Sequence, residues 1–259
     1  MKILKPNTVN LQDKNAGEKI LNSLNEFGFV VFSPMKTPDE LLNLVGLFGK
    51  PILHRDSDKR GITIVAPKET TIKESNLGFT NSELIPHTDG TGVADPADLL
   101  ALYCETPSTS GGESFMIDGK KIYDYMAANK LDMLKLLSTP ESAVFGNPKN
   151  NPFIGTIFNK STEDEHITLR FRGDMWGFYA GPISRILEQF MKILNDFKIT
   201  FQLSKNEGYI VNNKRILHGR RDFKGYREMQ RVLVTIDKST QYGSQLQKGF
   251  IPQSEIQNK

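Results

Sequence analysis

The stretch Leu84-Ile85-Pro86-His87-Thr88-Asp89-Gly90 joins an apolar run to a histidine, a carboxylate and a turn-forming glycine. Successive side chains of an extended strand point to opposite faces, so His87 and Asp89 are predicted on one side and Thr88 on the other. An imidazole and a carboxylate then converge on one point. With a second, distant histidine they form the set of two histidines and one carboxylate that suits non-haem Fe(II) and leaves coordination positions open.

His218 is the distant histidine that completes this set. The chain has four histidines, and His218 lies shortly after the apolar run 209–211. Arg231 follows thirteen residues later, at the start of a strand-like segment. The residues alone leave one alternative open, a hydrogen-bonded surface pair at His87 and Asp89 with a structural histidine at position 218. The order and spacing of all four residues favour the metal site.

The segments that carry these residues resemble the taurine dioxygenase and clavaminate synthase superfamily of Fe(II)/2-oxoglutarate-dependent oxygenases. Its pattern is His-x-Asp/Glu, a long insertion, a second histidine, and an arginine about ten to fifteen residues further on. The resemblance runs from the segment 27–32, Phe-Gly-Phe-Val-Val-Phe, to about Ile236, which is most of the chain. It implies a jelly-roll core with Fe(II) as the metal, 2-oxoglutarate as cosubstrate and O2 as oxidant.

The resemblance also implies roles for single residues. The metal ligands would be His87, Asp89 and His218. Arg231 would anchor the distal carboxylate of 2-oxoglutarate, because a planar guanidinium donates two hydrogen bonds to a carboxylate. Arg227 is the main alternative for that role. Ser114 falls where these enzymes have a hydroxyl residue that hydrogen-bonds the cosubstrate, although a serine at a strand start also pairs readily with the backbone.

The substrate is less well specified. Taurine dioxygenase-like enzymes grip a sulfonate with a second arginine, four residues beyond the cosubstrate arginine, and that position is Thr235 if Arg231 is the anchor. A sulfonate is therefore not expected. Six further polar residues would suit a zwitterionic, amino-acid-like small molecule, although a solvated strand face explains them equally well. These candidate substrate contacts are Asn81, Ser82, Glu83, Arg170, Arg172 and Asp174.

Composition restricts the partners and the compartment. Lysine and arginine number 33 against 30 aspartates and glutamates, without a dense basic block, so no nucleic-acid partner is indicated. The single cysteine, Cys104, excludes an intrachain disulfide and fits a reducing compartment. The N-terminus lacks a signal-like apolar core, and no apolar run is long enough to cross a membrane. These features predict a cytoplasmic protein that acts on a small molecule, and they do not specify an oligomeric state.

Hydrophobic patterning predicts a mainly β chain with packed helices around a double-stranded β-helix, or jelly-roll, core. Helical spacing is found in three segments: 14–27, 38–48 and 183–194. Short strand-like runs separated by turn residues fill most of the remainder, and the arginines at 170 and 172 are placed on one of them. The loop 67–76 is predicted to cover the site. A single oxygenase domain is expected over residues 1–237, followed by a loosely packed polar tail at 238–259.

The function predicted from these features is oxidation of an unactivated C–H bond of a small molecule, most simply hydroxylation, with release of succinate and CO2. An amino acid or a derivative is one candidate substrate class. Desaturation or ring formation on the same scaffold is one alternative. A non-catalytic metal-binding or ligand-sensing protein of the same fold is the other, because a fold does not determine a function.

Overall fold

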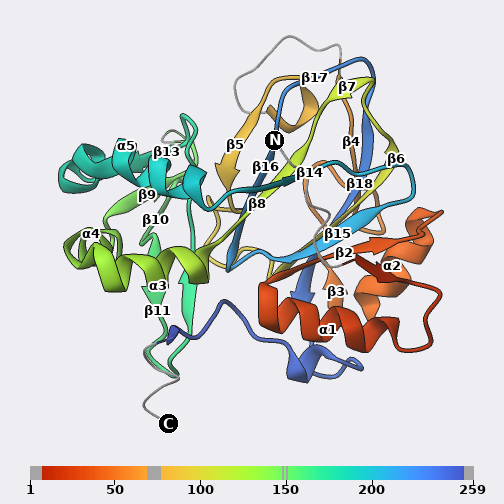
Figure 1. The fold of residues 1–259 in the computed structure, drawn as a ribbon, viewed down its shortest axis with the longest axis horizontal. Helices are drawn as coiled ribbons and strands as arrows, with labels where there is room; N and C mark the ends of the chain where they lie inside the picture. The colour runs from red at the N-terminus through yellow and green to blue at the C-terminus, as the bar shows by residue number, and fades with distance from the viewer. Residues whose placement is uncertain (1–7, 69–76, 148, 150, 254–259) are drawn as a thin grey trace.

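The computed structural model describes residues 8–68, 77–147, 149 and 151–253, and two β-sheets form its centre (Figure 1). The larger sheet contains, in spatial order, β1 (Thr8–Asn10), β2 (Phe29–Ser33), β15 (Gly208–Asn212), β6 (Leu99–Thr106), β18 (Glu228–Ile236) and β3 (Gly49–Pro51), and β4 (Ile62–Val65) also pairs with β18. The smaller sheet contains β14 (Ile199–Phe201), β8 (Ser114–Asp118), β16 (Ile216–Arg220) and β5 (Leu84–His87). This mainly β architecture with packed helices confirms the predicted fold class.

Side-chain alternation along the strands separates two hydrophobic clusters. Leu100 and Leu102 of β6 are buried in one cluster with Met116 of the smaller sheet. Their neighbours Leu99 and Ala101 are buried in a different cluster, on the opposite face of the same strand. The first cluster fills the space between the two sheets, so polar side chains in that space are exceptions that require an explanation.

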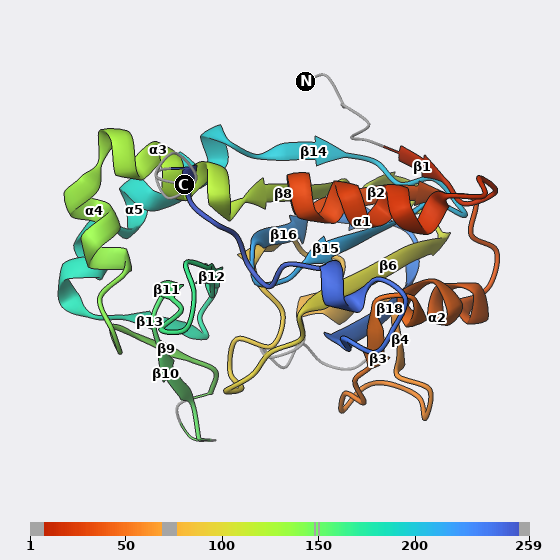
Figure 2. The same ribbon diagram turned by 90° about the horizontal axis from the view of Figure 1, so that it is seen from below.

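Two N-terminal helices cover the outer face of the larger sheet (Figure 2). Helix α1 (Ala16–Phe27) ends at Gly28, whose φ of 76° is the left-handed conformation that glycine adopts without strain. Helix α2 (Pro38–Gly46) begins after Thr37, whose side chain accepts a hydrogen bond of 3.2 Å from Glu40 N. Both helices confirm the spacing seen in the sequence.

The remaining helices and short strands build a second region, on the left of Figure 1, with a cluster of its own. Its helices are α3 (Gly119–Asn129), α4 (Leu131–Leu137) and α5 (Gly181–Asp196). Its strands are β9 (Ala143–Phe145), β10 (Phe153–Gly155), β11 (Phe158–Lys160), β12 (Ile167–Leu169) and β13 (Gly177–Tyr179). The short elements left over are β7 (Ser110–Gly111), β17 (Phe223–Lys224) and the 3-10 helices η1 (Leu77–Phe79) and η2 (Gly243–Gln245). No helix within the described ranges is both long and apolar enough to span a bilayer.

The segment after Asp237 differs from the loosely packed tail that its polar sequence predicts. The ring of Tyr242 stacks on Phe48 with centroids 5.6 Å apart, and Phe250 is fully buried. Phe250 also exchanges two backbone hydrogen bonds with Ile167, of 2.8 and 3.0 Å. A few apolar side chains therefore hold this polar segment on the domain. Residues 254–259 lie outside the described residues.

Two other expectations concern loops. The predicted covering loop 67–76 lies mostly outside the described residues, which resume at Leu77. The strand expected to carry two arginines ends at Leu169, so Arg170 and Arg172 lie beyond β12. Arg172 instead forms an isolated bridge with His87.

Candidate metal centre

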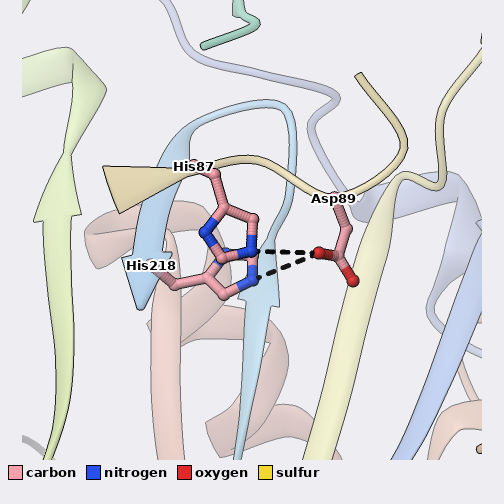
Figure 3. A group of neighbouring side chains, drawn as sticks. All are labelled: His87, Asp89 and His218. Atoms are coloured by element: carbon pink, nitrogen blue, oxygen red, sulfur yellow. Dashed lines mark ion pairs between the residues drawn. The ribbon is translucent and has the colours of Figure 1, made fainter. Parts of the chain in front are cut away.

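His87 and His218 are neighbours across two paired strands. His87 is the last residue of β5, His218 is the central residue of β16, and the two are directly opposite in the antiparallel register. Their ring centroids are 4.6 Å apart. Asp89 follows β5 in the turn that begins there. Figure 3 shows the three side chains pointing toward one another.

The distances suit a shared metal ion. Nε2 of His87 lies 3.4 Å and Nε2 of His218 lies 3.6 Å from Oδ1 of Asp89. One ligand atom from each residue lies within 4.8 Å of the others. Nδ1 of His87 lies 2.9 Å from the carbonyl oxygen of Ile85, which accepts a hydrogen bond if Nδ1 carries the proton and so leaves Nε2 free to bind a metal. The donor set therefore fits Fe(II), and it leaves coordination positions for exogenous ligands.

Burial and neighbouring charges keep Asp89 and His218 in their metal-binding forms. Burial by itself would raise the pKa of Asp89, but the charge of Arg231 and hydrogen bonds to His218 and His87 hold that pKa well below its usual value. Burial, followed by the charge of His87, lowers the pKa of His218. At neutral pH the site thus offers an anionic carboxylate and a neutral buried imidazole, which are the forms that coordinate a divalent cation.

The three residues line a cavity of about 280 Å³ between the two sheets. Nη1 of Arg231, from β18, lies 2.8 Å from Oδ2 of Asp89. Arg227 and Ser114 line the same cavity and are 6% and 2% exposed. Within the described part of the chain, no anionic group pairs with Arg227, whose guanidinium lies over the ring of Phe223 at 5.8 Å.

Of the six candidate substrate contacts, the structure brings two to the cavity. Arg172 and Asp174 line its wall and bind each other through two hydrogen bonds of 2.6 and 2.5 Å. Nη1 of Arg172 also lies 3.3 Å from the hydroxyl of Thr91. The pair is therefore available at the cavity surface, although each partner is already satisfied by the other.

The other four candidates do not line the cavity. Arg170 donates to the carbonyl oxygens of Thr91, Val93 and Ala94, so it holds the loop that follows Asp89. The remaining three, Asn81, Ser82 and Glu83, form an exposed turn. Asn81 donates a long hydrogen bond of 3.3 Å to Gly225 O, and the carbonyl oxygen of Ser82 accepts a hydrogen bond from Arg220. These three residues precede His87 closely in the sequence, but their turn ends before β5 reaches the cavity.

Sequence reasoning missed several residues of the cavity wall. Tyr209 is placed there by the alternation of β15, and its pKa is raised chiefly by burial. Trp176 and His54 come from loops, and burial followed by the charge of Arg231 lowers the pKa of His54. The strand period of 2 could have identified Tyr209, whereas no local signal identifies the loop residues.

Comparisons with known proteins agree with this geometry. The model of the family described as "Taurine catabolism dioxygenase TauD, TfdA family" matches residues 3–233. Human gamma-butyrobetaine dioxygenase is 22% identical over 182 residues, which are 62% of this chain and 46% of that protein. Trimethyllysine dioxygenase of Meyerozyma guilliermondii is 23% identical over 184 residues, 64% of this chain and 45% of that protein. The chain thus spans about half the length of the curated relatives that it matches.

Two solved structures share the fold. An asparagine oxygenase in complex with Fe(II), 2S,3S-3-hydroxyasparagine and succinate superposes with a TM-score of 0.65 at 13% identity, covering 89% of this chain and 94% of that one. The non-heme iron oxygenase OrfP, in complex with Fe and alpha-ketoglutaric acid, superposes with a TM-score of 0.66 at 16% identity, covering 87% and 81%. The likeness confirms the jelly-roll core.

Proposed function

The chain belongs to the Taurine catabolism dioxygenase TauD, TfdA family, and from this we propose that it is an Fe(II)- and 2-oxoglutarate-dependent dioxygenase that hydroxylates a small molecule. The observation that carries the proposal is the convergence of His87, Asp89 and His218 on one point of an internal cavity. When bound, Fe(II) with 2-oxoglutarate and O2 supplies the oxidising power for an unactivated C–H bond, with succinate and CO2 as coproducts.

The three side chains would hold the metal, and the cavity wall would position the organic ligands. Both arginines of the 227–231 segment reach this cavity, and they differ in their partners. Arg231 is engaged with Asp89, beside the metal position. Arg227 is a buried cation that has no anionic partner among the described residues. An unpaired buried guanidinium is costly unless a ligand neutralises it.

We therefore place the distal carboxylate of 2-oxoglutarate on Arg227, the residue that the sequence offers as the alternative to Arg231. Ser114 supports this assignment, because it lies in the same wall two residues after Gly112. A Cβ at Gly112 would come within 3.4 Å of Cδ of Arg227, so little space separates the turn before β8 from this arginine. The hydroxyl of Ser114 then serves as a second donor to the cosubstrate.

This assignment changes the expectation for the substrate. With Arg227 as the cosubstrate anchor, the position four residues further on is Arg231 instead of Thr235. The exclusion of a sulfonate, which depended on Thr235, then loses its basis. We propose a substrate that carries an anionic group near Arg231, such as the carboxylate of an amino acid or derivative, with Arg172 and Asp174 as further contacts. The curated relatives, named for gamma-butyrobetaine and trimethyllysine, point to the same class.

Anaerobic titration tests the proposal. Addition of 2-oxoglutarate to the Fe(II)-loaded protein should produce a visible metal-to-ligand charge-transfer band, and its absence would defeat the assignment. Slow succinate formation without substrate would distinguish a working oxygenase from a non-catalytic sensor of the same fold. A screen of amino acids and derivatives for faster succinate release would then identify the substrate. The cytoplasmic location stays a prediction from the single cysteine.

A further inference from the structure

Asn213 binds the main chain of Asp89 on both sides. Its Oδ1 accepts a hydrogen bond of 2.8 Å from Asp89 N, and its Nδ2 donates one of 3.0 Å to Asp89 O. The same Nδ2 donates to the carbonyl oxygen of Ala97 at 2.9 Å. Asn213 is 1% exposed, so these bonds form where water does not compete with them.

Asp89 needs such a support because no sheet ladder holds it. Strand β5 ends at His87, and the chain turns at Gly90, whose φ is 71°. Asn213 takes both main-chain hydrogen-bonding groups of Asp89, which in a strand would be taken by a neighbouring strand. The carboxylate of Asp89 is separated from this anchored backbone by a single methylene, so its position follows that of the backbone closely.

We propose that Asn213 is a positioning residue of the metal centre: it fixes the backbone of Asp89 and thereby the place of its carboxylate relative to His87 and His218. The proposal rests on the Fe(II) site proposed above. The segment between β15 and β16 then contributes to the metal centre twice. It contains Asn213, which supports Asp89, and it leads five residues later to His218.

Asn212 provides a matched control in the adjacent position. Its Nδ2 donates to the carbonyl oxygens of Gln247 and Gly249 at 2.8 and 3.1 Å, and the residue is 3% exposed. The two asparagines thus share residue type, burial and two donor bonds to main-chain carbonyls. They differ in the partner, which for Asn212 is the C-terminal segment instead of a metal ligand.

The test compares Asn213→Ala with Asn212→Ala in metal titrations under anaerobic conditions. Trp176, the single tryptophan of the chain, lines the cavity, so its fluorescence is the chosen readout of metal binding. Loss of a group that orients a ligand typically weakens metal affinity by about 10- to 100-fold, so we expect Fe(II) affinity to fall by that factor in Asn213→Ala. Asn212→Ala should keep the wild-type affinity, although both variants unfold at lower temperature.

Co(II) gives a second readout that a loss of stability alone does not change. The visible spectrum of the Co(II)-loaded protein reports coordination, and it should change in Asn213→Ala and stay unchanged in Asn212→Ala. Equal Fe(II) affinities and equal Co(II) spectra in the two variants would overturn the proposal. Failure of the wild-type protein to bind Fe(II) would instead remove the proposed function on which the inference rests.

If Asn213→Ala does not fold, two further measurements still test the proposal. Asn213→Asp keeps the shape and the Oδ1 acceptor but loses the donor to two carbonyl oxygens, and it should show the same direction of change. Hydrogen exchange at the amide of Asp89 can be followed in the wild-type protein. Metal binding should slow this exchange if the backbone and the carboxylate are coupled, and an unchanged rate would count against the proposal as directly as a normal Fe(II) affinity.

Discussion

Arg231 and Asp89 form an ion pair in which Nη1 lies 2.8 Å from Oδ2, whereas both histidine Nε2 atoms lie closest to Oδ1 of the same carboxylate. The two oxygens of Asp89 thus face different partners. One is directed to the metal position, and the other is held by a guanidinium. Because Arg231 already holds one oxygen of Asp89, we propose Arg227 instead as the anchor of the cosubstrate carboxylate.

The first prediction concerns the two arginines. Arg227→Gln should raise the 2-oxoglutarate requirement, because it removes the charge that we propose holds the distal carboxylate. Breaking such a buried pair costs on the order of 2 to 5 kcal/mol, or roughly thirtyfold to several thousandfold in affinity. Arg231→Gln serves as the comparison and should change this requirement less. Titration of the charge-transfer band measures both, and the reverse order would return the anchoring role to Arg231.

The second prediction concerns the metal ligands. His218→Ala removes a buried residue that we propose as a ligand, and it should weaken Fe(II) binding by more than about 100-fold, because loss of a ligand costs more than loss of its supporting partner. Tryptophan fluorescence titration gives the affinity. The control is His166→Ala, since His166 lies in a loop beside Asp164, outside the cavity wall. Similar affinities in the two variants would rule out His218 as a ligand.

The third prediction concerns a buried ion pair that joins three elements. Arg215 binds Asp118 through bonds of 2.8 and 2.7 Å and donates to the carbonyl oxygens of Asn25 and Glu26, at the end of α1. Arg215→Ala leaves Asp118 buried without its partner and should lower the free energy of unfolding by about 3 to 5 kcal/mol. Urea denaturation measures the change.

An exposed pair provides the comparison for Arg215. Lys19 and Asp13 are 2.6 Å apart with side chains 47% and 37% exposed. Lys19→Ala should therefore cost at most about 1 kcal/mol. Equal losses in the two variants would mean that the buried pair contributes no more than a surface contact.

The fourth prediction concerns pH. Burial, the largest cause, raises the pKa of the Cys104 thiol to about 11 from a usual value of 9.0. Because the unfolded chain releases this proton at lower pH, the stability that the thiol contributes is complete below about pH 9 and is lost as pH rises toward 11. The loss is at most about 3 kcal/mol.

Cys104→Ala isolates this contribution. The variant should show a shallower fall in the free energy of unfolding between pH 8 and pH 11 than the wild-type protein, measured by urea denaturation at each pH. Iodoacetamide should also label native Cys104 very slowly at pH 8 and label the unfolded chain readily. Parallel pH profiles for the two proteins would contradict the raised pKa.

The sequence predicts most of what is local in this structure. Strand alternation predicts that His87 and Asp89 lie on one side, and the structure brings them together, although Asp89 lies in the turn after β5. Helices α1 and α2 follow from hydrophobic spacing with recognisable caps. The choice between Arg227 and Arg231 depends on contacts across the sheet. A register shift between Glu228 and Met229 in β18 changes the pairing with β6, and no local sequence pattern predicts this shift.

Longer-range contacts account for the other differences. Arg170 donates to carbonyl oxygens nearly eighty positions away in the chain, so the sequence around Arg170 does not predict that it holds the loop after Asp89. The polar segment after Asp237 contains only scattered apolar residues, and Phe250 is buried because a backbone bridge to Ile167 places it in a distant cluster. The polar composition of this segment therefore predicts looser packing than the structure shows.

The packed C-terminal segment has a consequence for biosynthesis. Tyr242 belongs to the cluster beneath α1 and α2, whereas Phe250 belongs to the cluster of α3, α4 and α5. Neither cluster is complete until this segment has left the ribosome, after every strand and helix that it closes. The nascent chain consequently exposes part of two apolar surfaces until late in translation, and exposed apolar surface of this kind favours aggregation before folding is complete.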